Sequence, residues 1–151
     1  MASNGVNQAD TNKEASNGAA DTPAKKGTIL LIDDDKFLLD MYGMKFSQSG
    51  YTVEACLSGN EALGVLRGGF QPDVLLFDLT MPELDGFSFL KAISDERLAT
   101  NSLKIALTNQ SDESEKTKAM EMGASRYIVK ASMIPSEVVN TVSEELSKRH
   151  A

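Results

Sequence analysis

The chain has 151 residues and a formal net charge of −7, enough length for one domain of ordinary size. The acidic balance argues against nucleic-acid binding as the main activity, and no apolar run reaches the roughly 20 residues of a membrane span. The single cysteine, Cys56 in the apolar stretch YTVEACL, is expected to be a small core residue. Such sparse use of cysteine favours a reducing, cytoplasmic setting.

The first part of the chain differs in composition from the rest. Residues 1–26 are rich in Ala, Asn, Gly, Ser, Thr and Asp and contain one large aliphatic residue, Val6. Such a segment cannot bury enough apolar surface to offset the entropy that ordering would cost. We therefore expect residues 1–26 to be a disordered tail and residues 27–149 to form the folded domain.

From residue 27 onward, strand and helix patterns alternate five times. The expected strands are residues 28–33, 51–57, 72–79, 103–108 and 125–130, and the expected helices are residues 36–49, 59–69, 86–99, 111–123 and 134–149. The first, third and fourth strands are continuous apolar runs, which is typical of parallel strands covered by helices on both faces. Right-handed crossovers then predict a doubly wound α/β sandwich, with its ligand site beyond the carboxyl ends of the strands.

Polar residues gather at these carboxyl ends. In chain order they are Asp33, Asp34 and Asp35 after the first strand, Asp78 at the third, Thr108 at the fourth and Lys130 at the fifth. Asp35 also suits the N-cap of the following helix. Two carboxylates about 4 Å apart repel by roughly 4 kcal/mol at an effective dielectric near 20, so the acids need a neutralising cation. Carboxylates, backbone carbonyls and waters suit Mg²⁺, and the lack of His or Cys nearby argues against zinc.

A metal site beside an exposed aspartate, with a lysine and a hydroxyl opposite, fits phosphoryl transfer. Asp78 could act as the nucleophile and form an aspartyl phosphate. Lys130 and Mg²⁺ would neutralise charge on the phosphoryl oxygens, and Thr108 could donate a hydrogen bond to one of them.

Four motifs now carry a resemblance to a known family. They are LLIDDD, LLFDLTMPELDG, IALT and YIVK, in this order and on the expected elements. Over about residues 27 to 149 the sequence resembles the receiver domain of two-component response regulators, in particular stand-alone, chemotaxis-type receivers. The resemblance implies a flavodoxin-like (βα)5 sandwich with strand order 2-1-3-4-5.

The resemblance also implies roles at the acid cluster. Asp78 matches the phosphoacceptor, and Asp34 matches the carboxylate that binds Mg²⁺ directly, with Asp33 acting mostly through water. The backbone carbonyl of Thr80 matches the third protein ligand of the metal. Lys130 matches the lysine that contacts the phosphate.

Further positions match the parts that read out phosphorylation. Thr108 also matches the hydroxyl that contacts the phosphate. With Tyr127 it matches the pair that reports phosphorylation to a face formed by helix 111–123, strand 125–130 and helix 134–149. Thr80 and Gln110 match the variable positions that tune the lifetime of the phosphoryl group. Alternatively, Tyr127 is a half-buried strand aromatic, and Thr80 and Gln110 are plain loop residues.

Two positions depart from the family's usual pattern. Asn109 stands where a small residue usually follows the switch threonine, and it could restrict access to the phosphorylation site. Ala131 stands where proline usually follows the lysine. A cis peptide bond without proline costs roughly 2.5–4 kcal/mol, so we predict a trans bond between Lys130 and Ala131.

The function implied is that of a signalling protein, not an enzyme, although it can assist its own phosphorylation and dephosphorylation. Its partners would be a sensor histidine kinase or phosphotransfer protein and a downstream protein target. Because the chain ends at KRHA after the last helix, we expect a stand-alone receiver.

Two alternatives remain open. A pseudo-receiver would bind partners without phosphorylation, which the complete set of acids, threonine and lysine disfavours. A phosphatase of the haloacid-dehalogenase type would use Asp33 and Asp35 as its D-x-D pair. Such enzymes generally carry Thr or Val two residues later, where this chain has Phe37.

Overall fold

The computed structural model describes residues 26–150, so residues 1–25 of the predicted tail lie outside the described part. The described strands are β2 (Gly27–Ile32), β3 (Tyr51–Cys56), β4 (Val74–Asp78), β5 (Leu103–Thr108) and β6 (Arg126–Val129). The helices are α1 (Lys36–Gln48), α2 (Gly59–Arg67), α3 (Gly86–Asp95), α4 (Glu113–Glu121), the short 3₁₀ turn η1 (Lys130–Ser132) and α5 (Pro135–His150). Strands and helices alternate as the sequence predicts.

The strands form one parallel sheet in the order β3-β2-β4-β5-β6. Counted along the described strands, this is the predicted order 2-1-3-4-5, so the flavodoxin-like α/β sandwich is confirmed. Because all the strands run the same way, their carboxyl ends meet at one edge of the sheet. Asp78, the last residue of β4, pairs there with Leu107 of β5.

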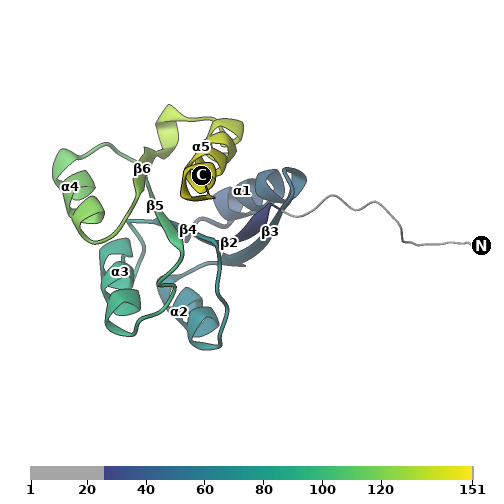
Figure 1. Ribbon diagram of the computed structural model, residues 1–151. Coiled ribbons are helices and arrows are strands. Elements are labelled where there is room, and N and C mark those ends of the chain that lie inside the picture. Colours follow the sequence, from purple (N-terminus) through teal and green to yellow (C-terminus); the bar gives the residue numbers. More distant parts are fainter. Residues whose placement is uncertain (1–25, 151) are drawn as a thin grey trace, which may run out of the picture.

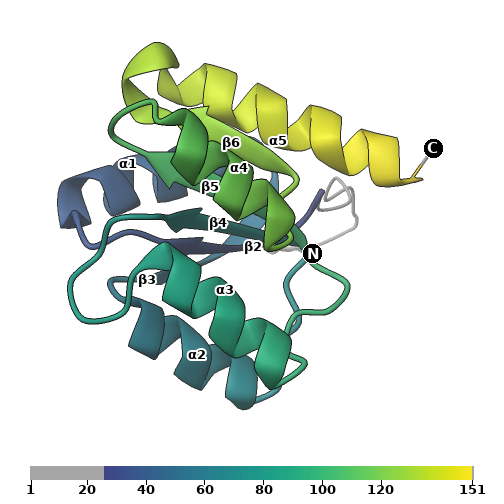
Figure 2. The same ribbon diagram turned by 90° about the vertical axis from the view of Figure 1, so that its left-hand side faces the viewer.

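Helices cover both faces of the sheet (Figures 1 and 2). On one face, alternate strand residues such as Ile29 and Leu31 pack against buried side chains of α1 and α5. On the other face, their neighbours Leu30 and Ile32 pack against α2, α3 and α4. This double coverage explains the continuous apolar runs of the central strands.

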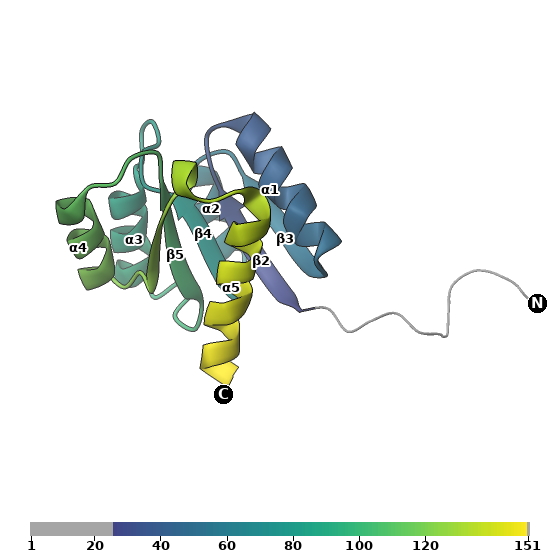
Figure 3. The ribbon, with the colours of Figure 1, turned by 90° about the horizontal axis from the view of Figure 1, so that it is seen from above.

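Helix α1 lies beside α5 across one face of the sheet (Figure 3). No helix within residues 26–150 is both long and apolar enough to cross a membrane. Cys56 is buried at the end of β3, and burial, with the charges of Glu61 and Glu54, raises the pKa of its thiol to about 12. The prediction that this cysteine belongs to the core is therefore confirmed.

Local signals fix where the elements begin and end. Asp35 caps α1 as predicted, and its carboxylate accepts a hydrogen bond from the backbone N–H of Leu38. Gly50 follows α1 with φ of 101°, a conformation that favours glycine. Strand β6 ends one residue before Lys130, which begins η1. The Lys130–Ala131 peptide bond is trans, as predicted.

Candidate functional site

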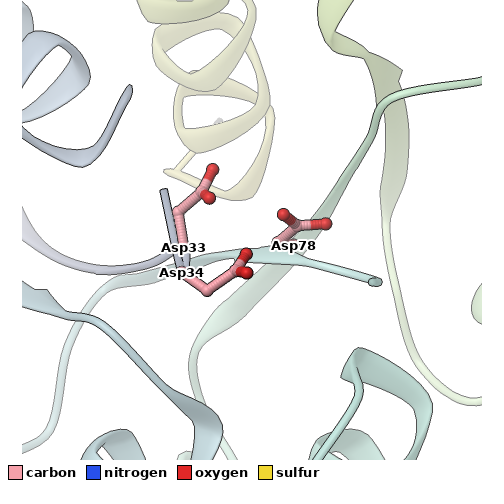
Figure 4. A group of neighbouring side chains, drawn as sticks. All are labelled: Asp33, Asp34 and Asp78. Atoms are coloured by element: carbon pink, nitrogen blue, oxygen red, sulfur yellow. The ribbon is translucent and has the colours of Figure 1, made fainter. Parts of the chain in front are cut away.

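Three aspartates meet where β2 and β4 reach the carboxyl edge of the sheet. Asp33 and Asp34 follow β2 directly, and Asp78 ends β4. Each contributes one carboxylate oxygen to a group whose members all lie within 4.8 Å of one another. Figure 4 shows the Asp34 carboxylate pointing toward Asp78. The predicted convergence of the acids is confirmed within the described residues.

The acids differ in exposure. Asp33 and Asp78 are 0% and 2% exposed, whereas Asp34 is open to solvent. The expectation that Asp78 is an exposed aspartate is therefore wrong. It sits on a strand that is buried throughout, and the side chain of Lys130 closes over its carboxylate. Asp34 is the member of the cluster that solvent reaches most readily.

Lys130 bridges the two buried carboxylates. Its Nζ lies 2.7 Å from Asp33 Oδ2 and 3.0 Å from Asp78 Oδ2, and its side chain is 8% exposed. The remaining oxygens also have partners. Asp33 Oδ1 accepts the backbone N–H of Asp35 at 2.9 Å, and Asp78 Oδ1 accepts that of Thr80 at 2.9 Å. Asp33 and Asp78 are thus each held from two sides.

The charges of this trio do not balance. Burial raises the pKa of Asp78, although the N–H of Thr80 and the ammonium of Lys130 oppose the effect, and the charge of Asp33 adds to it. Burial alone would lower the pKa of Lys130, but its hydrogen bonds and ion pairs with Asp33 and Asp78 raise it. One ammonium can neutralise only one of the two buried carboxylates. The excess negative charge, increased by Asp34 nearby, favours a second cation.

The donor set indicates which cation fits. The group that could hold a metal consists of the three carboxylates Asp33, Asp34 and Asp78, without histidine or cysteine. Oxygen ligands of this kind suit hard cations such as Mg²⁺ and not zinc. One acid is exposed, so an ion could enter from solvent. The residues present therefore fit Mg²⁺.

Thr108 and Tyr127 meet at one backbone carbonyl. The Thr108 hydroxyl, at the end of β5, donates to the carbonyl oxygen of Gln110 at 3.2 Å. The Tyr127 hydroxyl, on β6, donates to the same oxygen at 3.2 Å and accepts the backbone N–H of Asp112 at 3.2 Å. Asp112 is the N-cap of α4. Hydrogen bonds therefore run from the edge of the acid cluster to the start of α4.

A polar hollow lies beside the acid cluster. Its volume is about 240 Å³, and its lining includes Thr80, Thr108, Asn109 and Gln110. The two predicted tuning positions and the unusual Asn109 thus share one cavity. The sequence did not indicate that the backbone carbonyl of Gln110 would also serve as the shared acceptor.

Tyr42 is a buried residue of α1 that no motif of the sequence assigns to the site. It is 2% exposed. Burial raises the pKa of its phenol, the charge of Lys130 lowers it, and the charge of Asp33 raises it. The available signal was a tyrosine two helical turns after the acids, at a core position.

Fold and site together define a class of protein: a parallel α/β sandwich with three acids and a lysine gathered at the carboxyl edge of its sheet. The family model for the response regulator receiver domain matches residues 29–142. The chain belongs to this family.

Similar proteins agree with this assignment. The response regulator SaeR of Staphylococcus aureus (strain USA300) is 29% identical over 120 residues, which cover 80% of this chain and 50% of SaeR. The chain thus spans about half the length of the curated relatives it matches. A CheY-like receiver domain protein from Methanospirillum hungatei JF-1 has a TM-score of 0.74 at 26% identity, covering 85% of this chain and 98% of that one. The chemotaxis protein CheY4 of Vibrio cholerae has a TM-score of 0.72 at 25% identity, and the match covers 81% of this chain and 98% of that one.

Proposed function

We propose that this protein accepts a phosphoryl group on Asp78 from a sensor histidine kinase or a phosphotransfer protein, with Mg²⁺, in the cytoplasm. Phosphorylation then switches a protein-interaction face formed by α4, β6 and α5. The observation that carries the proposal is the buried Asp33–Lys130–Asp78 cluster with Asp34 beside it, at the carboxyl edge of a receiver fold.

Asp78 is the nucleophile in this proposal. One of its carboxylate oxygens attacks the phosphorus, the bond from phosphorus to the donor's histidine nitrogen breaks, and the imidazole leaves with the electron pair. The backbone N–H of Thr80, bound to Asp78 Oδ1, helps to orient the carboxylate. Asp34, Asp78 and the carbonyl of Thr80 would hold Mg²⁺, with Asp33 acting through water; the ion supplies charge neutralisation on the phosphoryl oxygens.

Lys130 and Thr108 would then change partners. Lys130 redirects an N–H from the carboxylate of Asp78 to a phosphoryl oxygen, where a desolvated ammonium is most effective. The Thr108 hydroxyl leaves the carbonyl of Gln110 and donates to another phosphoryl oxygen. The carbonyl is left to Tyr127, whose hydroxyl also binds the N–H of Asp112. This rearrangement would carry the signal to the start of α4.

The lifetime of the aspartyl phosphate depends on how water reaches it. Thr80 and Gln110 line the polar hollow beside the cluster, together with Asn109. In this proposal Thr80 and Gln110 tune the access of water to the aspartyl phosphate, and the larger Asn109 narrows the path by which a phosphodonor reaches Asp78.

The two alternatives can be weighed against the same geometry. A haloacid-dehalogenase-type mechanism needs Asp33 and Asp35 to act as a pair, yet Asp35 caps α1 and is not a member of the group formed by Asp33, Asp34 and Asp78. A pseudo-receiver would leave Asp78 without phosphate and is separated by experiment.

The test is phosphotransfer from candidate histidine kinases that have been autophosphorylated with labelled phosphate. Label should move to the native protein only with Mg²⁺ and should be absent from Asp78→Asn, which keeps the fold. A native protein that takes no label from any kinase or small phosphodonor would support the pseudo-receiver. Undiminished labelling of Asp78→Asn would exclude Asp78 as the acceptor.

A further inference from the structure

The hydroxyl of Tyr42 is a buried polar group without an evident partner. Tyr42 is 2% exposed and belongs to the core cluster that α1 and α5 build with the sheet. Within residues 26–149, no hydrogen bond to this hydroxyl is found. The other buried tyrosine, Tyr51, places its hydroxyl 2.7 Å from Ser143 Oγ. Since buried hydroxyls are normally paired, the unpaired one at Tyr42 calls for a reason.

The direction of the side chain points to the acid cluster. Tyr42 lies about two helical turns beyond Asp35, the N-cap of α1. Side chains on a helix lean back toward its N-terminus, so we expect the ring of Tyr42 to extend toward the end of α1 that adjoins the cluster. The charges of Lys130 and Asp33 both act on its hydroxyl, which agrees with this direction.

The hydrogen bonds of Lys130 leave room for another acceptor. An ammonium has three N–H donors, and within the described residues Lys130 makes two hydrogen bonds, one to Asp33 and one to Asp78. In the phosphorylated state, Asp78 would carry the phosphoryl group and the acids would face the metal. Lys130 would then exchange carboxylate acceptors for a phosphoryl oxygen while remaining buried, and each N–H donor left without an acceptor in a buried site is costly. A phenol oxygen can supply one.

We propose that Tyr42 is a positioning residue for Lys130: its phenol oxygen accepts a hydrogen bond from the ammonium once Lys130 turns from the carboxylates, and thereby holds the ammonium toward the phosphoryl oxygen. This inference rests on the proposed function of Asp78. It adds a residue of α1 to the set that prepares the site for phosphoryl transfer.

The test measures the rate of phosphorylation by acetyl phosphate at saturating Mg²⁺. Tyr42→Phe removes the hydroxyl and keeps the ring, and it should slow phosphorylation by about tenfold or more, in line with loss of one hydrogen bond to a charged group. Its melting temperature should stay the same or rise, because an unpaired buried hydroxyl is removed. Tyr51→Phe is the matched control: it should leave the rate unchanged and lower the melting temperature.

A second comparison asks whether Tyr42 acts through Lys130. In a Lys130→Gln background, Tyr42→Phe should cause no further slowing, because coupled residues are not additive. An unchanged rate in Tyr42→Phe, or equal slowing with and without Lys130, would overturn the proposal. If Tyr42→Phe does not fold, Tyr42→Leu must show the same slowing. A native protein that is never phosphorylated would instead contradict the function of Asp78, and the role of Tyr42 with it.

Discussion

Replacing Lys130 with methionine removes the ammonium that bridges two buried carboxylates. The contacts of 2.7 Å and 3.0 Å to Asp33 and Asp78 each correspond to about 6 kcal/mol of Coulomb attraction at an effective dielectric near 20. The cost of burying the three charged groups cancels much of this attraction. Removing one partner of a buried pair typically costs about 3–5 kcal/mol, and we expect Lys130→Met to lower the free energy of unfolding of the metal-free protein by that amount.

Urea unfolding in EDTA at neutral pH measures this loss. Lys91→Met is the matched control, because Lys91 Nζ lies 2.6 Å from Asp95 but both side chains are more than half exposed, so stability should hardly change. Lys130 has a raised pKa, so its contribution is fully present below the usual value of 10.5 and should be lost as the pH rises through the higher folded value. Mg²⁺ should reduce the deficit of Lys130→Met, since it replaces the missing charge. A variant as stable as the native protein in EDTA would refute the reasoning.

Three further predictions concern the same site. Because the pKa of Asp78 is raised from 3.8, the native state binds more protons than the unfolded state just above that pH, and stability falls as the pH rises through this window. In EDTA, Asp78→Asn should therefore have a higher melting temperature than the native protein at neutral pH, but not below pH 3.8. A higher melting temperature at every pH would contradict this. Mg²⁺ should raise the melting temperature of the native protein by linkage, whereas Asp34→Asn should be more stable without metal and respond little to it; a normal response in that variant would exclude Asp34 as a ligand. Tyr127→Phe should speed hydrogen exchange in the first turn of α4, because the backbone N–H of Asp112 loses the tyrosine hydroxyl as its acceptor, while labelling of Asp78 persists. Unchanged exchange would show that Tyr127 does not stabilise the start of α4.

Much of the fold follows from local patterns in the sequence. Continuous apolar runs such as the one before Asp33 predict buried parallel strands, and the N-cap Asp35 and the glycine Gly50 mark the limits of α1. Once the strands are known to be parallel, the residues that end them must meet at one edge. This is why the convergence of Asp33, Asp34 and Asp78 could be predicted.

Finer features of the site depend on how side chains from distant segments settle together. The sequence places Lys130 at the edge but does not say that it bridges Asp33 and Asp78, because this depends on the turn η1 and on the side-chain rotamer. The burial of Asp78 was missed for the same reason. The acceptor shared by Thr108 and Tyr127 is the backbone carbonyl of Gln110, and every residue has such a carbonyl, so the sequence could not single it out. Tyr42 resembled an ordinary core position, because helical spacing shows which face a residue occupies but not which groups lie near its hydroxyl.

The most direct test of the account is the intact mass of the protein after incubation with acetyl phosphate, with and without Mg²⁺, followed by tandem mass spectrometry of the peptide that contains Asp78. The account predicts one added HPO₃ group that requires Mg²⁺, is lost in alkali, lies on Asp78 and is absent from Asp78→Asn. No added mass under any condition, or an added group on another residue, would contradict it.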